Sequence, residues 1–239
     1  MFLTPFVSQD NSNKKDGEFT ISRQQGSDFA KQLANDFNPL HDVSAKRFVV
    51  PGDLLFSWVL TQQGLFANMA FEFNSMLSAD TVFTLDSQGE SGLLLQSAGK
   101  ECLSVEYSGQ CSQNSELIES IARAYVKFSG ETFPHILVPL MQQQDVMINP
   151  ARPMVMYQSM KIQWHDFNAT DVKLEIAQQD ISMNGKRADV NLQFNFTSAG
   201  KVVGQGQKSL LLSGLRPYND ACIQGLVNDY EAHKATYNA

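Results

Sequence analysis

The feature that most constrains the fold of this chain is a repeated order of segments, in which helical patterns precede short alternating strands. When Ser27 is placed on Ser115, SDFAKQLA lies over SELIESIA, and FVVP lies over ILVP at the same separation. With about three further residues inserted, NMAFEFNSMLSADTVFTL lies over SMKIQWHDFNATDVKLEI. Three blocks in one order, at a nearly constant separation, predict an internal duplication with its boundary near Gln110–Asn114.

Each copy is expected to be an antiparallel sheet wrapped around one helix. GSDFAKQLAND predicts a first helix with Ser27 as its N-cap. A second helix opens at Gly52 and ends at Gly64. Six of its apolar residues point nearly all round it, which predicts burial: Leu54, Leu55, Phe56, Trp58, Val59 and Leu60. The segments FANMAFEFNSML, DTVFTLDS, SGLLLQSAG and ECLSVEYSGQC then alternate as strands do. We therefore predict an α+β fold with repeats over residues 1–112 and 113–239, the second ending in a terminal helix.

The net negative charge of the chain makes a nucleic-acid partner unexpected. The 239 residues carry a formal net charge of −7 and no basic run. A phosphate backbone favours a basic face, so no nucleic-acid partner is expected, although a local basic patch suffices for the phosphates of an acyl-thioester carrier. The N-terminus lacks a signal-peptide pattern, and no apolar stretch approaches the roughly 20 residues that span a bilayer. We expect a cytoplasmic protein with no membrane partner.

The cysteines and the histidines other than His41 are not predicted to be site residues. The three cysteines form no C-x-x-C pair and are expected to be reduced thiols: Cys102, Cys111 and Cys222. His135 and His165 are expected to be structural histidines, and His233 falls in the terminal helix. No His, Cys, Asp or Glu spacing is typical of a metal site, so neither metal nor cofactor is expected.

The segment ANDFNPLHDV, residues 34–43, concentrates acid/base chemistry in a turn. Histidine is a side chain suited to acid/base chemistry, and Pro39 allows the chain to turn back so that Asp36 and His41 meet on one water molecule. A plain turn with an acidic helix end is the alternative interpretation. Gly52 opens the apolar helix, where a residue without Cβ lets a carbonyl oxygen approach the backbone N–H.

The run SDFAKQLANDFNPLH, followed by VPGDLLFSWVL, resembles the hydratase segment of the MaoC-like, R-specific enoyl-CoA hydratase family. That family has the hotdog fold, so the resemblance implies a double hotdog here. It also implies that Asp36 and His41 hold the reacting water, that the Gly52 N–H polarises the thioester carbonyl, and that Asn38 supports the loop. Over its whole length the chain resembles more closely an uncharacterised bacterial family of unknown function, which implies no activity.

Two departures from the hydratase pattern affect the predicted site. The connection from His41 to Gly52 is short, and Asp53 stands where the family commonly has an apolar residue. Arg47, within that connection, is a candidate for binding a carrier phosphate, with a solvated surface position as the alternative. If Asp53 points inward, its carboxylate competes with an enolate for the same N–H groups.

The second copy lacks the predicted site residues. Asp36 falls on Ala124, Asn38 on Val126, His41 on Ser129 and Gly52 on Leu140. The sequence therefore predicts one site per chain, in the N-terminal half, with the degenerate half acting as a wall of the acyl pocket.

The sequence supports three functions. The first is a hydratase or dehydratase acting on an acyl thioester of coenzyme A or acyl carrier protein. The second is a non-catalytic hotdog protein that binds an acyl chain, acyl-CoA or a protein partner. The third is a thioesterase, in which a carboxylate activates water at the carbonyl carbon. A monomer and a homodimer are both compatible with the sequence, because exposed strand edges often pair.

Overall fold

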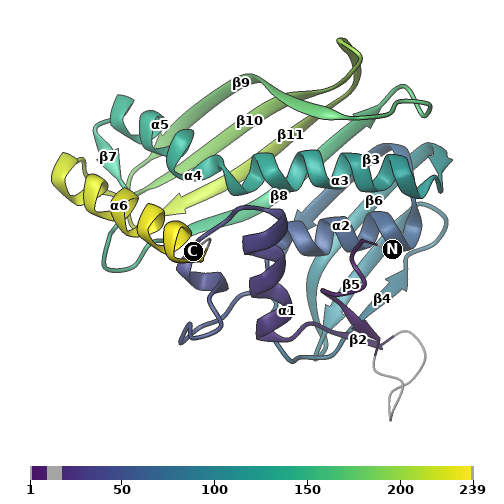
Figure 1. Cartoon of the computed structure of the whole chain (residues 1–239), viewed down its shortest axis with the longest axis horizontal. Helices are drawn as coiled ribbons and strands as arrows, with labels where there is room; N and C mark the ends of the chain where they lie inside the picture. Colours follow the sequence, from purple (N-terminus) through teal and green to yellow (C-terminus); the bar gives the residue numbers. More distant parts are fainter. Residues whose placement is uncertain (1, 10–17, 238–239) are drawn as a thin grey trace.

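A single antiparallel sheet of ten strands organises the computed structural model, which describes residues 2–9 and 18–237 (Figure 1). The strand order is β1-β2-β4-β5-β6-β3-β8-β11-β10-β9, and every neighbouring pair is antiparallel. The strands are β1 (Ser8–Gln9), β2 (Glu18–Thr20), β3 (Leu65–Phe73), β4 (Phe83–Ser87), β5 (Gly92–Ser97), β6 (Lys100–Ser112), β8 (Val155–Trp164), β9 (Lys173–Asn184), β10 (Arg187–Ser198) and β11 (Lys201–Ser213). A separate pair joins β7 (Val146–Met147) to β12 (Arg216–Pro217).

The sheet has the symmetry of a duplication. From the central β3–β8 pair outward, β6, β5 and β4 follow on one side, and β11, β10 and β9 follow on the other. The β5–β6 and β10–β11 hairpins both turn on the tetrapeptide SAGK. In each turn the Ala-Gly pair has positive φ, with values of 49° and 73° at Ala98 and Gly99 and of 49° and 74° at Ala199 and Gly200. Positive φ at both central residues matches the right-handed twist of a hairpin.

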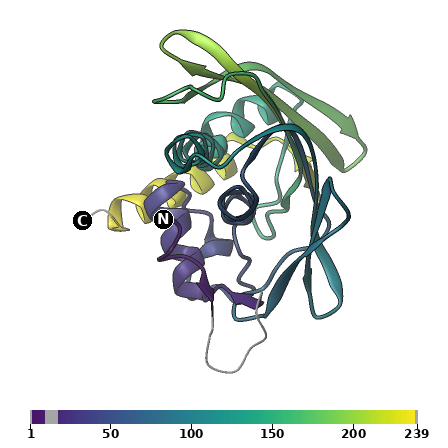
Figure 2. The same cartoon turned by 90° about the vertical axis from the view of Figure 1, so that its right-hand side faces the viewer.

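The helices lie on one side of this sheet. They are α1 (Arg23–Asp28), its π-helical continuation η1 (Phe29–Leu33), the 3₁₀ turn η2 (Pro39–His41), α2 (Gly52–Gln63), α3 (Ser115–Gly130), α4 (Thr132–His135), α5 (Leu137–Gln143) and α6 (Asp220–Tyr237). Figure 2 shows α2, in dark blue, and α3, in teal, end-on and side by side within the curve of the sheet. No helix among the described residues is long and apolar enough to span a membrane.

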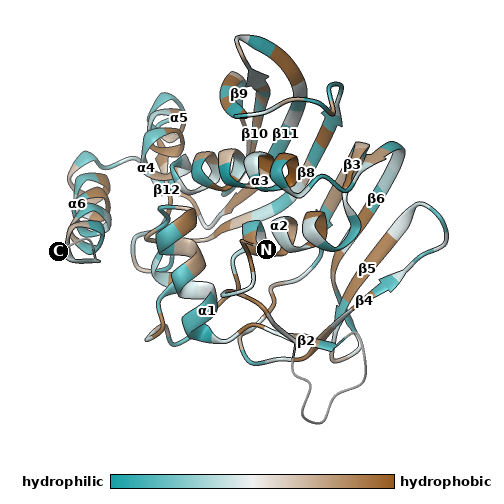
Figure 3. Cartoon of the chain, turned by 45° about the vertical axis from the view of Figure 1, so that its right-hand side comes forward, coloured by the Kyte–Doolittle hydropathy of each residue, from teal (hydrophilic) through white to brown (hydrophobic). Residues whose placement is uncertain are grey.

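The two central helices each cover one half of the sheet. Every residue of α2 from Asp53 to Leu60 is buried, and the Phe56 ring meets Phe71 of β3 edge-on at 5.1 Å. On α3, Tyr125 contacts Phe194 of β10 at 5.9 Å between ring centroids. Figure 3 shows hydrophobic residues, in brown, along β5 and on α2 and α3. A sheet wrapped around one helix, present twice, defines an α+β double hotdog.

Two expectations about the helices are wrong. The first helix begins at Arg23 rather than after Ser27, because Ser22 and Gln25 form a reciprocal capping box, and Ser27 is buried within the helix. By the repeat alignment, SELIESIA should match the first helix, and ILVP should precede the central helix of the second half. Instead, SELIESIA begins α3, which is that central helix, and ILVP lies at the start of the short peripheral α5. Amphipathic periodicity shows that a helix has a buried face but not which surface it covers, so the strand alignment of the repeat is informative and the helix alignment is not.

Candidate active site

The loop after η1 is built by local hydrogen bonds. Asn35 takes the left-handed conformation with φ of 54°, and the Asp36 N–H donates to the Ala30 carbonyl at 2.8 Å. The Asp36 Oδ1 accepts from the Asn38 N–H at 2.9 Å, and the Asn38 Oδ1 accepts from the Leu40 N–H at 3.0 Å. Asp and Asn side chains favour such turns. Asn38 therefore caps the turn that carries His41.

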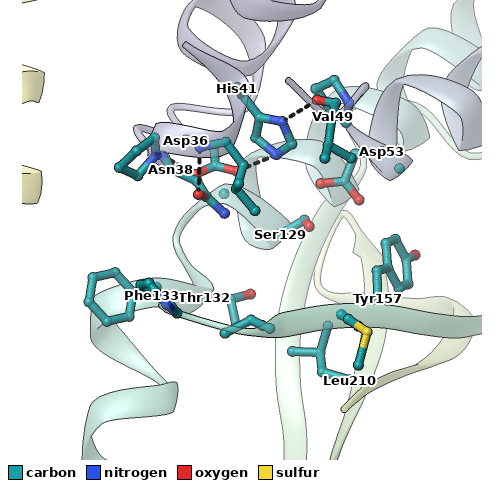
Figure 4. Close-up of a pocket in the computed structure, with 18 of the residues that line it drawn as sticks. Asp36, Asn38, His41, Val49, Asp53, Ser129, Thr132, Phe133, Tyr157 and Leu210 are labelled. Atoms are coloured by element: carbon teal, nitrogen blue, oxygen red, sulfur yellow. Dashed lines mark hydrogen bonds and ion pairs between the residues drawn. The ribbon is translucent and has the colours of Figure 1, made fainter. Parts of the chain in front are cut away.

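Asp36 and His41 face each other in this loop (Figure 4). The His41 Nε2 lies 3.7 Å from the Asp36 Oδ2, and the Nδ1 lies 2.7 Å from the carbonyl oxygen of Val49. Because a carbonyl only accepts, Nδ1 carries the proton and donates it, which leaves the lone pair of Nε2 directed toward the carboxyl group. At 3.7 Å the pair is too far apart for a direct hydrogen bond and can share one small polar molecule.

Burial raises the pKa of the Asp36 carboxyl group. Loss of water around the carboxyl group raises its pKa above the usual 3.8, while His41 and the Asn38 N–H act in the opposite direction and the Asp53 carboxylate adds to the rise. The neutral acid is thus favoured to a higher pH than in an exposed aspartate. A carboxyl group with a raised pKa that faces the Nε2 of an imidazole can exchange protons with a small molecule held between them.

Gly52 places the N-terminus of α2 beside the cavity that Asp36 and His41 line. A Cβ on this residue would lie 2.9 Å from Cδ1 of Tyr157 and 3.2 Å from Cε1 of Phe73, so only glycine allows this close approach. The preceding Pro51 provides no side-chain cap. The first N–H groups of a helix have no partner within the helix, so this end is suited to an anionic oxygen.

The cavity that joins these groups has a volume of about 880 Å³. Asp36, Asn38, His41 and Gly52 all line it, so the structure brings four of the five predicted site residues together. Both halves of the chain form its walls, and seven of the apolar residues in them are Leu55, Phe73, Leu77, Leu137, Ile148, Val155 and Leu210. Apolar walls with a few polar groups at one end are typical of small-molecule sites.

Arg47 lies outside this lining. Its side chain is exposed, and its Nη2 contacts the sulfur of Met76 at 3.7 Å. Because Met76 does line the cavity, Arg47 is beside the cavity without reaching into it. The short connection that carries Arg47 is tied down by Arg23, whose Nη1 donates to the carbonyls of Val43 at 2.9 Å and Ala45 at 2.6 Å.

The sequence analysis missed the contribution of the second half. Lys208 of β11 and Tyr157 of β8 both line the cavity, as does Ser129 at the end of α3. The Lys208 Nζ donates to the Ser129 hydroxyl and lies 4.4 Å from the centre of the Tyr157 ring. The available signal was the strand alternation in QKSLLL, which puts Lys208 on the same inward face as Leu210.

The terminal helix was also missed as part of the site. Tyr230 of α6 lines the cavity, and its hydroxyl lies 3.1 Å from the Asn35 carbonyl and 3.3 Å from the Gly130 carbonyl. The same hydroxyl accepts from the Phe37 N–H at 3.3 Å. These bonds tie the loop on both sides of Asp36 to α3. His233, three residues after Tyr230 in α6, is exposed and also lines the cavity.

The fold and cavity thus define a double hotdog with one cavity that combines an acid/base pair, a helix N-terminus and apolar walls. Residues 1–221 match the model of the family described as "Protein of unknown function (DUF3581)", and the chain belongs to that family. A search of curated proteins finds no match.

Solved structures with a similar fold include a tesB protein of Mycobacterium avium subs paratuberculosis, with 8% identity, a TM-score of 0.48, and coverage of 84% of this chain and 95% of that one. An acyl-CoA thioesterase II, TesB2, from Mycobacterium marinum has 12% identity, a TM-score of 0.43, and coverage of 92% and 99%. A MaoC-like dehydratase has 8% identity, a TM-score of 0.44, and coverage of 86% and 97%.

Proposed function

We propose that this protein adds water to an α,β-unsaturated acyl thioester, or removes it in the reverse direction, at the Asp36–His41 pair in the cavity that both halves line. The acyl group is carried by coenzyme A or acyl carrier protein. The observation that carries the proposal is the 3.7 Å separation of the His41 Nε2 and the Asp36 Oδ2 in a cavity that also contains the N-terminus of α2. No cofactor is required for this reaction.

His41 is the base in this proposal. Its Nδ1 donates to the Val49 carbonyl, so the Nε2 lone pair is available to take a proton from water. The water oxygen then forms a bond with the β-carbon of the substrate, and the electron pair of the double bond moves toward the thioester oxygen. The Gly52 N–H, at the positive end of the α2 dipole, stabilises that developing enolate.

Asp36 is the acid. The raised pKa of its carboxyl group favours the protonated form, which delivers a proton to the α-carbon as the enolate collapses. The imidazolium of His41 then returns a proton to the Asp36 carboxylate through a bridging water, and both groups are restored. One water molecule is consumed, and its two hydrogens end on the α-carbon and on the new hydroxyl.

Hydration of trans-2-enoyl-CoA substrates of increasing length, followed by loss of the conjugated enoyl absorbance, tests the proposal. We expect Asp36→Asn and His41→Ala each to lower kcat by about 10²–10⁴-fold, the usual contribution of a positioned acid or base. His135→Ala is the matched control, because His135 is exposed and does not line the cavity. Folded wild-type protein that is inert at every chain length would contradict the proposal, and binding without turnover would indicate a non-catalytic acyl carrier.

A second reaction, thioester hydrolysis, is favoured by one specific observation. Asp53 follows Gly52 at the start of α2, and its buried Oδ1 has no hydrogen-bond partner among the described residues. A carboxylate at that position can activate water for attack on the carbonyl carbon. Release of free thiol that is lost in Asp53→Asn and kept in Asp36→Asn would identify hydrolysis, and the opposite pattern for enoyl hydration identifies the hydratase.

A further inference from the structure

Lys208 is a buried cation without a buried anionic partner. It occupies an inward-facing position of β11, is 4% exposed, and forms no ion pair among residues 2–9 and 18–237. Its contacts are the hydroxyl of Ser129 and the rings of Tyr157 and Tyr125. An ammonium group has three N–H donors, and taking it out of water without a counter-charge is costly. Burial lowers the pKa of Lys208, while Asp53 and then Asp36 oppose that change.

Asp53 is the complementary group on the other side of the cavity. It comes from the first turn of α2, is 8% exposed, and has an Oδ1 that accepts no hydrogen bond within the described part of the chain. Figure 4 shows its carboxylate directed toward the open centre of the cavity. Asp53 and Lys208 both line this cavity, but no ion pair joins them across it. The two halves of the protein therefore each present an incompletely bonded charge to the same space.

The charges of Asp53 and Lys208 determine which functional group of a ligand can bind between them. A carboxylate on the ligand would face the Asp53 carboxylate, and an ammonium group would face Lys208, so each is opposed by a like charge. A neutral hydroxyl accepts from the Lys208 Nζ through its oxygen and donates its hydrogen to the Asp53 Oδ1. It satisfies both buried groups at once, whereas an unsubstituted acyl chain leaves them desolvated and unbonded.

We propose that Asp53 and Lys208 form a subsite for a hydroxyl group carried on the acyl chain of the ligand, separate from the hydroxyl that hydration creates at the β-carbon. The substrate class is thus an acyl thioester with an additional hydroxyl substituent. This inference rests on the proposed function, because it takes the acyl thioester as the occupant of the cavity. Ser129 and Tyr157 hold Lys208 in place and are positioning residues for the subsite.

Calorimetric titration with hexanoyl-pantetheine thioester and its isomers that carry one hydroxyl, moved carbon by carbon beyond the β-position, tests the proposal. Pantetheine is the part that coenzyme A and acyl carrier protein share. We expect one isomer to bind wild-type protein about tenfold or more tightly than hexanoyl-pantetheine, because hydrogen bonds to charged groups are among the stronger ones. Lys208→Met should abolish that preference, and Asp53→Asn should reduce it, because the amide oxygen still accepts but carries no charge.

Lys161→Met is the matched control, since Lys161 lies on the neighbouring strand β8 with an exposed side chain and does not line the cavity. It should keep the full preference. Thermal unfolding verifies that each variant is folded, and the isosteric Asp53→Asn provides a second test if Lys208→Met does not fold. Equal affinity for plain and hydroxylated thioesters overturns the subsite alone. Failure of every thioester to bind folded protein overturns the proposed function and the subsite together.

Discussion

Asp36 shows how one residue couples stability to the proposed chemistry. Its carboxyl group is held by the Asn38 N–H and directed toward His41, yet burial raises its pKa. A raised pKa in the folded state means that ionisation is opposed by folding. The part of the stability that depends on the protonated form is therefore complete below the unfolded value of 3.8 and is lost as the pH rises through the folded pKa.

Replacing Asp36 with asparagine should consequently stabilise the protein at neutral pH while removing its activity. The amide cannot ionise, and its oxygen can still accept from the Asn38 N–H. The unfolding free energy of Asp36→Asn minus that of wild type should be small below pH 3.8 and should grow as the pH rises through the folded pKa of Asp36. Denaturant unfolding at a series of pH values measures this difference, and a difference that does not change with pH would contradict the assignment.

Gly130 is a second residue whose identity is fixed by its surroundings. A Cβ at this position would lie 1.7 Å from the backbone oxygen of Ala34, next to the loop that carries Asp36. We expect Gly130→Ala to lower the unfolding free energy by about 3 kcal/mol or more, since backbone must move to relieve the overlap. Gly225→Ala is the control: nothing lies within 4 Å of its Cβ position in α6, and a gain of about 0.5–1 kcal/mol is expected. Thermal or denaturant unfolding checks both.

At the scale of elements, α6 supports the loop that carries Asp36. The Tyr230 hydroxyl is shared among Asn35, Phe37 and Gly130, so a single side chain connects the terminal helix, the loop and the end of α3. Burial, followed by the Asp36 carboxylate, raises the pKa of Tyr230, which keeps its hydroxyl neutral and able to donate. The loop around Asp36 is therefore positioned by contacts far away in the sequence.

Tyr230→Phe should separate this supporting role from the packing of the ring. The aromatic contacts with Phe37 and Phe133 are retained, but the Phe37 N–H loses its buried acceptor, which costs about 1–3 kcal/mol of unfolding free energy. Enoyl hydration should fall about tenfold, because misplacing an acid by a fraction of an ångström is costly. Its pH profile should also shift with the environment of Asp36. Tyr237→Phe, at an exposed contact with Gln32, should leave rate and profile unchanged.

For the whole molecule, the decisive feature is that the cavity belongs to both halves. The β3–β8 pair joins the two parts of the sheet at its centre, and the rings of Phe56 on α2 and Tyr125 on α3 meet at 4.7 Å. Tyr157 and Lys208 then line a cavity whose acid/base pair comes from the first half. The second half is a structural partner of the predicted site rather than a separate unit.

Separated halves should therefore not fold independently. Expressed alone, residues 1–112 and 113–239 would each expose the edge of a central strand and the apolar face of a central helix, which favours aggregation. We expect each fragment to lack cooperative unfolding, and co-expression to recover a folded complex. Size-exclusion chromatography and thermal unfolding followed by circular dichroism measure this. A monomeric N-terminal fragment that unfolds cooperatively would refute the expectation.

Features that depend on neighbouring residues could be predicted from the sequence alone. The alternating strands, the apolar helix from Gly52 to Gly64 and the turn that presents Asp36 and His41 all follow from local periodicity, glycine and Asx chemistry. Even the wrong helix start had a local signal, the Ser22–Gln25 capping box.

Tertiary contacts determine which helix covers the second half of the sheet, how Lys208 and Tyr157 reach the cavity, and how Tyr230 holds the loop. These contacts join residues that are far apart along the chain. Periodicity identifies the face of an element that is buried, but it does not identify the element against which that face packs, because the same apolar stripe fits many surfaces and the choice is made by the whole core.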